Sequence, residues 1–147
     1  MAKKYALPRD IQVDYNDELN TDALYDPEQK MIFLGKKFDA LEKGQKKFVI
    51  YREFGKIYAD IVVRQEDFTS VREDGIFGTH VEDEFTGLYK TKTFSDSVSN
   101  AFALFCSGNL SRKELNLRYP KAYNYLFNHV KEQDVVHLNK LVTCFAE

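Results

Sequence analysis

The sequence predicts a single α+β domain that spans residues 1–147. Short segments in which apolar and polar residues alternate, as they do in strands, fill the first part of the chain, and apolar residues at helical spacing follow. A length of 147 residues suits one well-buried core and is short for two. We therefore expect a small N-terminal antiparallel sheet packed on a long central helix and on C-terminal helices.

Alternation and turn chemistry predict the N-terminal strands. Ile11, Val13 and Tyr15 alternate with polar residues in DIQVDYN, as in a half-buried strand, and the turn-rich stretch NDELNTD follows. The stretch ALYDPEQKMIFLG then predicts a β-hairpin. Its residues 26–29, Asp-Pro-Glu-Gln, are typical of a turn and lie between two apolar runs.

A long helix is expected from about residue 38 to 63, with Gly44 as a candidate break. Within it, the stretch FVIYREFGKIYAD (48–60) is apolar nearly all the way round, yet it contains Arg52, Glu53 and Lys56. Charges are costly to bury unless they are paired or serve a site. This helix is therefore the first place to look for function.

The rest of the chain predicts an irregular segment and further helices. Residues 64–93 contain three glycines and many charges, so we expect an irregular excursion that includes a short strand. A helix is predicted over about 95–107, with Ser95 or Asp96 as its cap and Gly108 after its end. A helical turn before Pro120, a helix after it, and a strand or short helix over 135–147 complete the chain.

Composition argues against a membrane protein and a strongly basic nucleic-acid binder. The 21 Lys and Arg residues are balanced by 23 Asp and Glu residues, so no global positive field attracts nucleic acid. No apolar run approaches the roughly 18 residues that cross a bilayer, and no export signal is visible. We expect a cytoplasmic protein without membrane or nucleic-acid partners.

The motif in the long helix resembles the zincin family of metallopeptidases. If His replaced Arg52 and Lys56, the string REFGK would read HEFGH, the zinc-binding signature. Residues four apart lie on one face of a helix, so two imidazoles there hold one Zn²⁺ while the intervening Glu polarises the bound water.

Two later stretches extend this resemblance. FSDSVSNAFALF (94–105) resembles the E-x-F-A-E-A-F-A-L helix of small zincin-like peptidases of phages and mobile elements, with Asn100 where the third ligand Glu would stand. YPKAYNY (119–125) resembles the Y-P-K-x-Y-x-Y stretch that commonly ends such domains. The resemblance covers about residues 10–130 in element order and implies a zincin-like fold, a phage or mobile-element origin and the host cell cytoplasm.

The differences from the family lie at the metal ligands. Arg52 and Lys56 offer no lone pair to Zn²⁺ near neutral pH, and Asn100 replaces a carboxylate, so only Glu53 remains of the catalytic set. We expect a pseudoenzyme without metal or other cofactor that binds another protein through the former cleft and residues 64–93. Arg52 or Lys56 is expected to pair with Glu53 near the former metal position.

Other interpretations remain open. REFGK fits a plain amphipathic helix with a Glu53–Lys56 surface pair. An active metal-dependent peptidase would use Glu53 with unidentified ligands, for which His80 is a candidate. A phage protein associated with nucleic acid would use basic stretches such as GQKKF and SRKELNLRYPK. A separate site built from His80, His129 and His137 is not expected, because no pair has a compact ligand spacing.

Overall fold

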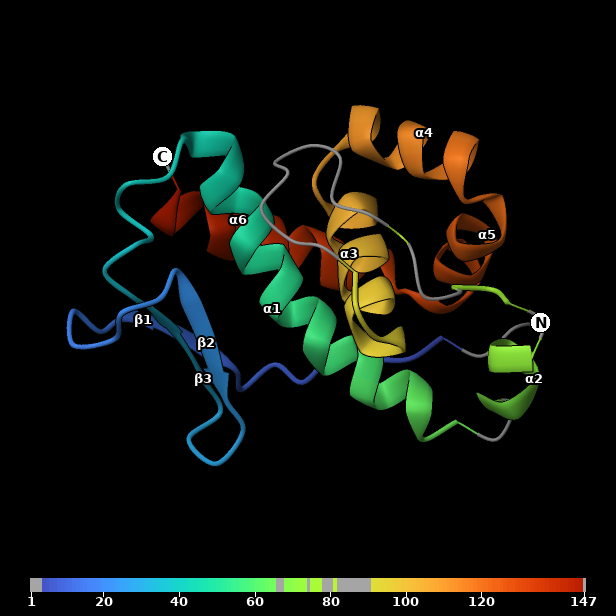
Figure 1. Ribbon diagram of the computed structural model, residues 1–147, viewed down its shortest axis with the longest axis horizontal. Helices are drawn as coiled ribbons and strands as arrows, with labels where there is room; N and C mark the ends of the chain where they lie inside the picture. The colour runs from blue at the N-terminus through green and yellow to red at the C-terminus, as the bar shows by residue number, and fades with distance from the viewer. Residues whose placement is uncertain (1–3, 66–67, 74, 78–80, 82–90, 147) are drawn as a thin grey trace.

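The computed structural model describes residues 4–65, 68–73, 75–77, 81 and 91–146. These residues form a three-stranded sheet and six helices, which confirms the predicted α+β class. Figure 1 shows α1 running between the sheet on one side and α3, α4 and α5 on the other. In chain order the elements are β1 (Gln12–Tyr15), β2 (Ala23–Asp26), β3 (Met31–Leu34), α1 (Lys43–Val63), α2 (Phe68–Glu73), α3 (Phe94–Cys106), α4 (Asn109–Arg118), α5 (Pro120–His129) and α6 (Glu132–Phe145).

The sheet is mixed, so the prediction of an antiparallel sheet is wrong. β2 and β3 form the predicted hairpin and pair antiparallel, with Tyr25 opposite Ile32. β1 lies along the other edge of β3 and runs parallel to it, with Val13 opposite Ile32. Alternation in a four-residue strand marks its buried face, but it carries no information about the direction of the neighbouring strand.

α1 begins later than predicted and is continuous. Phe38 lies in a turn before the helix, where its backbone N–H donates to the carbonyl oxygen of Gly35 at 3.1 Å. Glu42 is the N-cap, and its backbone N–H donates to the side-chain oxygen of Gln45 at 3.0 Å. Gly44 lies in the first turn and does not break the helix. Every residue from 48 to 55 is buried, because α3, α6 and β2 all pack against α1.

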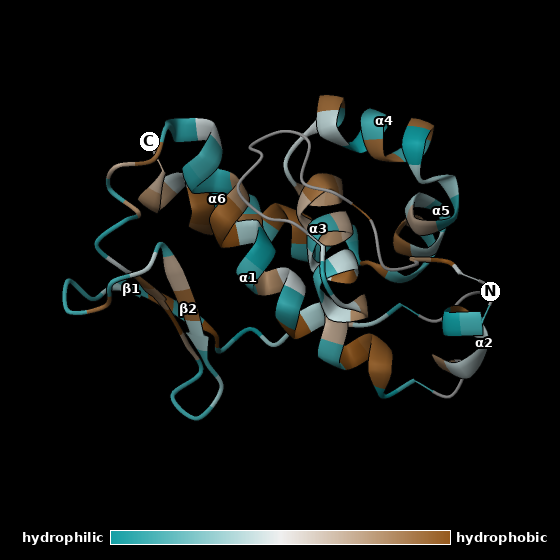
Figure 2. Cartoon of the chain, viewed as in Figure 1, coloured by the Kyte–Doolittle hydropathy of each residue, from teal (hydrophilic) through white to brown (hydrophobic). Residues whose placement is uncertain are grey.

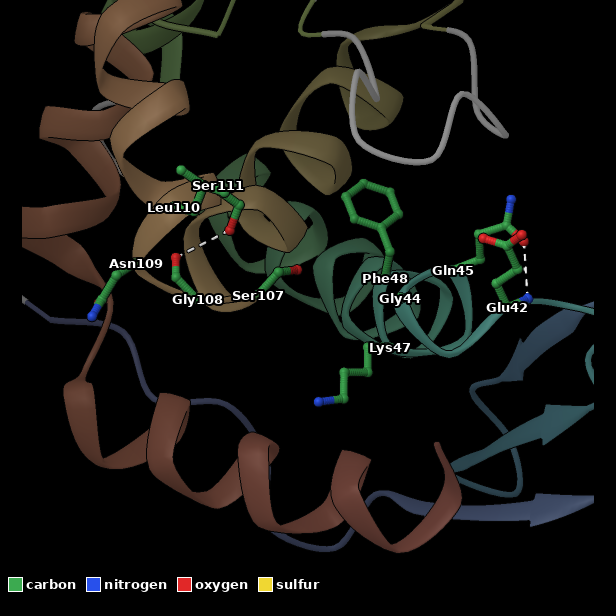
Figure 3. A pocket seen from close by; sticks show the side chains of 10 residues that line it. All are labelled: Glu42, Gly44, Gln45, Lys47, Phe48, Ser107, Gly108, Asn109, Leu110 and Ser111. Carbon is green, nitrogen blue, oxygen red and sulfur yellow. Dashed lines mark hydrogen bonds between the residues drawn. The ribbon is translucent and has the colours of Figure 1, made fainter. Parts of the chain in front are cut away.

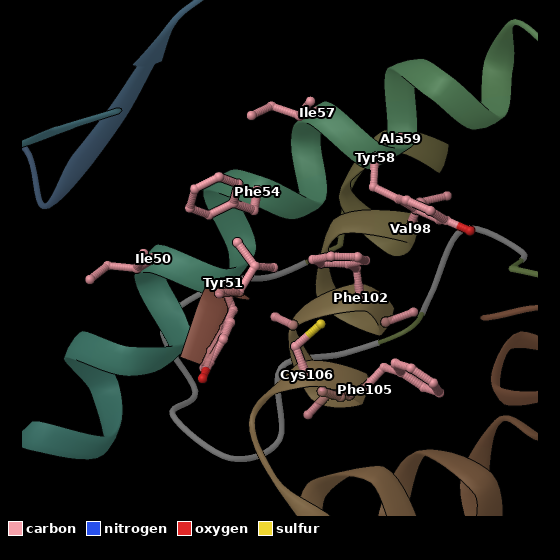
Figure 4. Close-up of a cluster of buried hydrophobic side chains, with 14 of the residues drawn as sticks. Ile50, Tyr51, Phe54, Ile57, Tyr58, Ala59, Val98, Phe102, Phe105 and Cys106 are labelled. Carbon is pink, nitrogen blue, oxygen red and sulfur yellow. The ribbon is translucent and has the colours of Figure 1, made fainter. Parts of the chain in front are cut away.

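α1 and α3 pack with their backbones in near contact at Gly55 and Ser99. A Cβ atom added to Gly55 would lie only 2.7 Å from the carbonyl oxygen of Ser99. Beside this contact the rings of Tyr58 and Phe102 stack with their centroids 5.0 Å apart. Figure 4 shows Tyr58, Phe102 and Cys106 between the two helices. A glycine at this position is therefore required for the close approach of the two helices.

The C-terminal part of the chain is mainly helical, with one isolated parallel β-bridge between Val130 and Tyr5. The predicted helical turn before Pro120 is the ten-residue α4, and Pro120 is the first residue of α5. The tail forms α6, which settles the choice between strand and helix. In the segment 64–93 the structure contains α2, and the predicted short strand lies largely outside the described residues.

Hydropathy follows this arrangement. Figure 2 shows hydrophobic residues of α1, α3 and α6 where these helices meet, and a hydrophilic loop between β2 and β3. Within the described part of the chain, no helix combines the length and the apolar character needed to span a bilayer.

Candidate functional site

The structure brings the four predicted site residues together in pairs. Nε of Arg52, on α1, donates a hydrogen bond to Oδ1 of Asn100, on α3, at 2.9 Å. Nζ of Lys56 donates to Oε1 of Glu53 at 2.7 Å within α1. Arg52, Glu53 and Asn100 are buried, whereas the side chain of Lys56 is 38% exposed. The long helix and the NAFALF helix therefore touch through the residues that the motifs single out.

Asp96 provides the counter-charge for Arg52, a role that the sequence did not reveal. Its Oδ1 lies 3.3 Å from Nη2 of Arg52. Its Oδ2 accepts the backbone N–H groups of Lys92 and Thr93, each at 3.1 Å. Thr93, rather than Ser95 or Asp96, is the N-cap of α3, and Asp96 is the fourth residue of its capping box. The Thr-x-x-Asp spacing of residues 93–96 is the sequence signal that indicates where α3 begins.

Asn100 holds two chain segments against α3. Its amide nitrogen donates to the carbonyl oxygen of Val81 at 3.0 Å and to Oγ1 of Thr91 at 3.3 Å. Ser97, one turn earlier, accepts the N–H of Val81 at 3.1 Å and donates to the carbonyl oxygen of Phe77 at 2.8 Å. Ser97 and Thr91 could not be predicted from the sequence, because local patterns do not show which distant backbone group a hydroxyl contacts.

Glu53 is the least satisfied member of the cluster. It is 2% exposed, and Oε2 has no hydrogen-bond partner among the described residues. Burial raises the pKa of Glu53 above its ordinary value, while the charges of Lys56 and Arg52 act in the opposite direction. The Glu53–Lys56 pair is thus half-buried, which corrects the alternative of a plain surface pair.

The metal-ligand candidates do not assemble elsewhere in the described part of the chain. No group of three or more His, Cys, Asp or Glu side chains there is arranged to hold a metal ion. His129 packs between aromatic rings, with centroids 4.8 Å from Tyr5 and 4.3 Å from Tyr125. His80 lies outside the described residues, so its predicted role in the rival peptidase is not tested by this structure.

The cluster is thus a largely buried set of donors and acceptors, joined by the Arg52–Asn100, Arg52–Asp96 and Glu53–Lys56 contacts. The side chains of Arg52 and Lys56 donate hydrogen bonds and offer no lone pairs, and the side-chain amide of Asn100 both accepts and donates. Such a set neutralises carboxylates and fixes two helices relative to each other. In comparisons with protein-family models, curated proteins and solved structures, the chain matches none.

Proposed function

We propose that this chain is a catalytically inactive zincin-like protein that acts by binding another protein. The proposal draws on the order of the motifs and on the contact between the helices that carry them. In the zincin signature, a ligand from a later helix must reach the helix that carries the two His positions. The 2.9 Å bond between Arg52 and Asn100 supports the proposed correspondence of positions.

That bond is the observation that carries the proposal. At two positions where the family has metal ligands, the side chains of Arg52 and Asn100 instead form a donor–acceptor pair with each other. The side chain at the second His position, Lys56, donates to Oε1 of Glu53, the carboxylate that would otherwise polarise a metal-bound water. The positive charges of Arg52 and Lys56 would thus take the place of the charge of a zinc ion.

The proposed origin and location follow from the resemblance alone. A small zincin-like protein of a phage or mobile element would work in the host cytoplasm, where its partner would be another protein. A scaffold that has lost its ligands and kept its helix contact is suited to binding rather than to hydrolysis.

A variant with restored ligands tests the correspondence directly. The triple change Arg52→His, Lys56→His and Asn100→Glu should create a site that binds about one zinc ion per chain. The matched control carries the same two His changes with Asn100→Gln, which removes the third ligand and should bind zinc at least about tenfold more weakly. Zinc binding is measured by competition with a chromogenic chelator, and folding by circular dichroism. A folded triple variant that binds zinc no better than the control would contradict the proposal.

A working metal-dependent peptidase is the second candidate, and Glu53 is the observation that favours it. A buried carboxylate with a raised pKa, whose Oε2 has no hydrogen-bond partner among the residues that the structure describes, has features of a general base. Hydrolysis of fluorescent casein by the purified protein, abolished by Glu53→Gln and by chelation, would establish this candidate. Absence of hydrolysis in the presence of added zinc would favour the inactive protein.

A further inference from the structure

The sheet carries apolar side chains on the face that points away from the core. Ile32 and Leu34 of β3 are fully buried, so the side chains that alternate with them lie on the opposite face, which we call the outer sheet face. The strand register places Asp14, Phe33 and Leu24 in one row across this face, and Gln12, Met31 and Asp26 in the next. Leu24 is 46% exposed, and Phe33 and Met31 are half-buried. Exposed apolar side chains that gather in this way are typical of a contact surface.

The outer sheet face is also negatively charged. Residues 10–29 contain seven Asp or Glu residues and no Lys or Arg. Oδ1 of Asp14 accepts the backbone N–H of Tyr15 at 2.8 Å, and Oδ1 of Asp26 accepts the backbone N–H of Glu28 at 2.9 Å. Bonds to neutral backbone groups leave the negative charge of both carboxylates in place. A partner that carries positive charge and apolar side chains therefore suits this face.

The outer side of α4 has the opposite character. Leu110 and Leu117 are 70% and 71% exposed, the highest fractions among the large apolar side chains of the described residues. They are seven residues apart and thus lie on the same side of the helix, with the exposed Lys113 between them. Residues 109–132 contain five Lys or Arg residues and two acidic residues, in a chain with a formal net charge of -2. We call the surface of Leu110, Lys113 and Leu117 the outer α4 face.

The pair of exposed leucines extends beyond the nearby hollow. Leu110 lies beside a hollow of about 590 Å³ between the start of α1 and the junction of α3 with α4 (Figure 3). The lining of this hollow contains one lysine, Lys47, and one glutamate, Glu42, so charge favours no particular occupant there. Leu117 is not part of the lining. The two leucines therefore form a surface of their own.

The two faces match in size as well as in charge. A rise of 1.5 Å per residue places Leu110 and Leu117 about 10 Å apart along α4. Three neighbouring strands place Asp14 and Leu24, at the two ends of one row, also about 10 Å apart. Figure 1 shows the sheet at the lower left of the molecule and α4 at the upper right, with α1 and α3 between them. One chain therefore cannot bring its own two faces together.

We propose that the outer α4 face docks on the outer sheet face of a second copy of this chain. Contact between two outer α4 faces would bring two copies of Lys113 together, and contact between two sheets would bring two acidic faces together, so charge favours the contact between unlike faces. Such a contact joins copies head to tail and leaves one face open at each end. The inference uses none of Arg52, Glu53, Lys56 and Asn100, so it is independent of the proposed function.

Sedimentation velocity of the full chain tests the proposal. The mean mass should rise above that of one chain between about 10 and 500 µM, since a contact of this small size gives weak affinity. Leu24→Glu and Leu117→Glu each place a charge in the apolar contact and should weaken association at least about tenfold. Lys113→Glu leaves both leucines in place and should weaken association at least about threefold. Circular dichroism verifies that each variant is folded.

A mixture of two variants distinguishes contact between unlike faces from contact between like faces. Equal amounts of Leu24→Glu and Leu117→Glu should form a species of two chains and nothing larger, because one intact face of each kind remains. Val63→Glu and Val136→Glu are matched controls, since these valines are 46% and 52% exposed and lie outside both faces. Each control should leave association within about twofold of the unchanged chain.

Three results would overturn the proposal. The unchanged chain could stay monomeric at every concentration, the controls could weaken association as much as the face variants, or the mixture could form no species of two chains. A monomer that sediments with phosphatidylglycerol vesicles, and no longer does so with Leu117→Glu, would assign the leucines of α4 to a membrane surface instead.

Discussion

Two cations one turn apart on α1 have very different surroundings. Arg52 is 7% exposed and bonds to Asn100 and Asp96, both on α3. Lys56 has a side chain that is 38% exposed, and the one partner found for it among the described residues is Glu53, on its own helix. The first cation therefore joins two helices, whereas the second only offsets part of the charge of a buried carboxylate. Position within the packing, rather than charge itself, decides what each residue contributes.

The largest expected effect comes from removing the inter-helix cation. Arg52→Met leaves Asp96 and the side-chain oxygen of Asn100 without their partner, so the free energy of unfolding should fall by about 3–5 kcal/mol. Arg118→Met is the matched control, because Arg118 pairs with Glu114 at an exposed site on α4. It should cost less than about 1 kcal/mol. Urea unfolding followed by circular dichroism measures both, and equal losses would remove the distinction between the two environments.

The helix contact itself gives the next effect. Gly55→Ala places a methyl group against the backbone of Ser99, so the helices must separate and the free energy of unfolding should fall by about 1–3 kcal/mol. Gly44→Ala is the control within the same helix, since its added Cβ meets no described atom within 4 Å. That change should raise stability by up to about 1 kcal/mol. If both substitutions stabilise the protein, the close approach of α1 and α3 is wrong.

Prediction from sequence was most reliable where one short stretch contains the whole signal. The break at Pro120 is where the sequence predicts it, and the hairpin turn predicted at residues 26–29 lies at 27–30, one residue later, because turn residues and proline act locally. The direction of β1 could not be predicted, because strand pairing depends on the path of the chain between strands. The parallel pairing of β1 with β3 therefore depends on tertiary structure and not on the local sequence of β1.

The candidate site was also predicted in part. The resemblance placed Arg52 and Asn100 together, and the structure has them bonded. The expectation that Arg52 or Lys56 pairs with Glu53 is met by Lys56, while Arg52 takes Asp96 as its acidic partner. The sequence identifies Asp96 only as a candidate helix cap, because a local pattern does not show which side chain approaches from another helix.

The smallest expected effect is the pH dependence that Glu53 confers. Burial raises its pKa in the folded state above the ordinary value of 4.5, so the folded protein binds this proton more tightly than the unfolded chain does. Glu53 alone should therefore make the free energy of unfolding fall as the pH rises from about 4.5 through its raised pKa. Below about pH 4.5 Glu53 is protonated in both states, so the cost of burying its charge is absent. Unfolding by urea from pH 4 to 8 should show a shallower decline for Glu53→Gln than for the unchanged protein. Glu114→Gln, in the exposed pair, should not alter the slope in this way.

Zinc content of the unchanged protein tests the central claim most directly. The chain should be purified without chelators, equilibrated with a slight excess of zinc, passed through a desalting column and analysed by plasma mass spectrometry. With Arg52, Lys56 and Asn100 bonded within the cluster, we predict far less than one zinc ion per chain. About one zinc ion per chain, lost when Glu53 and its neighbours are changed but not when Glu114 is, would contradict the account.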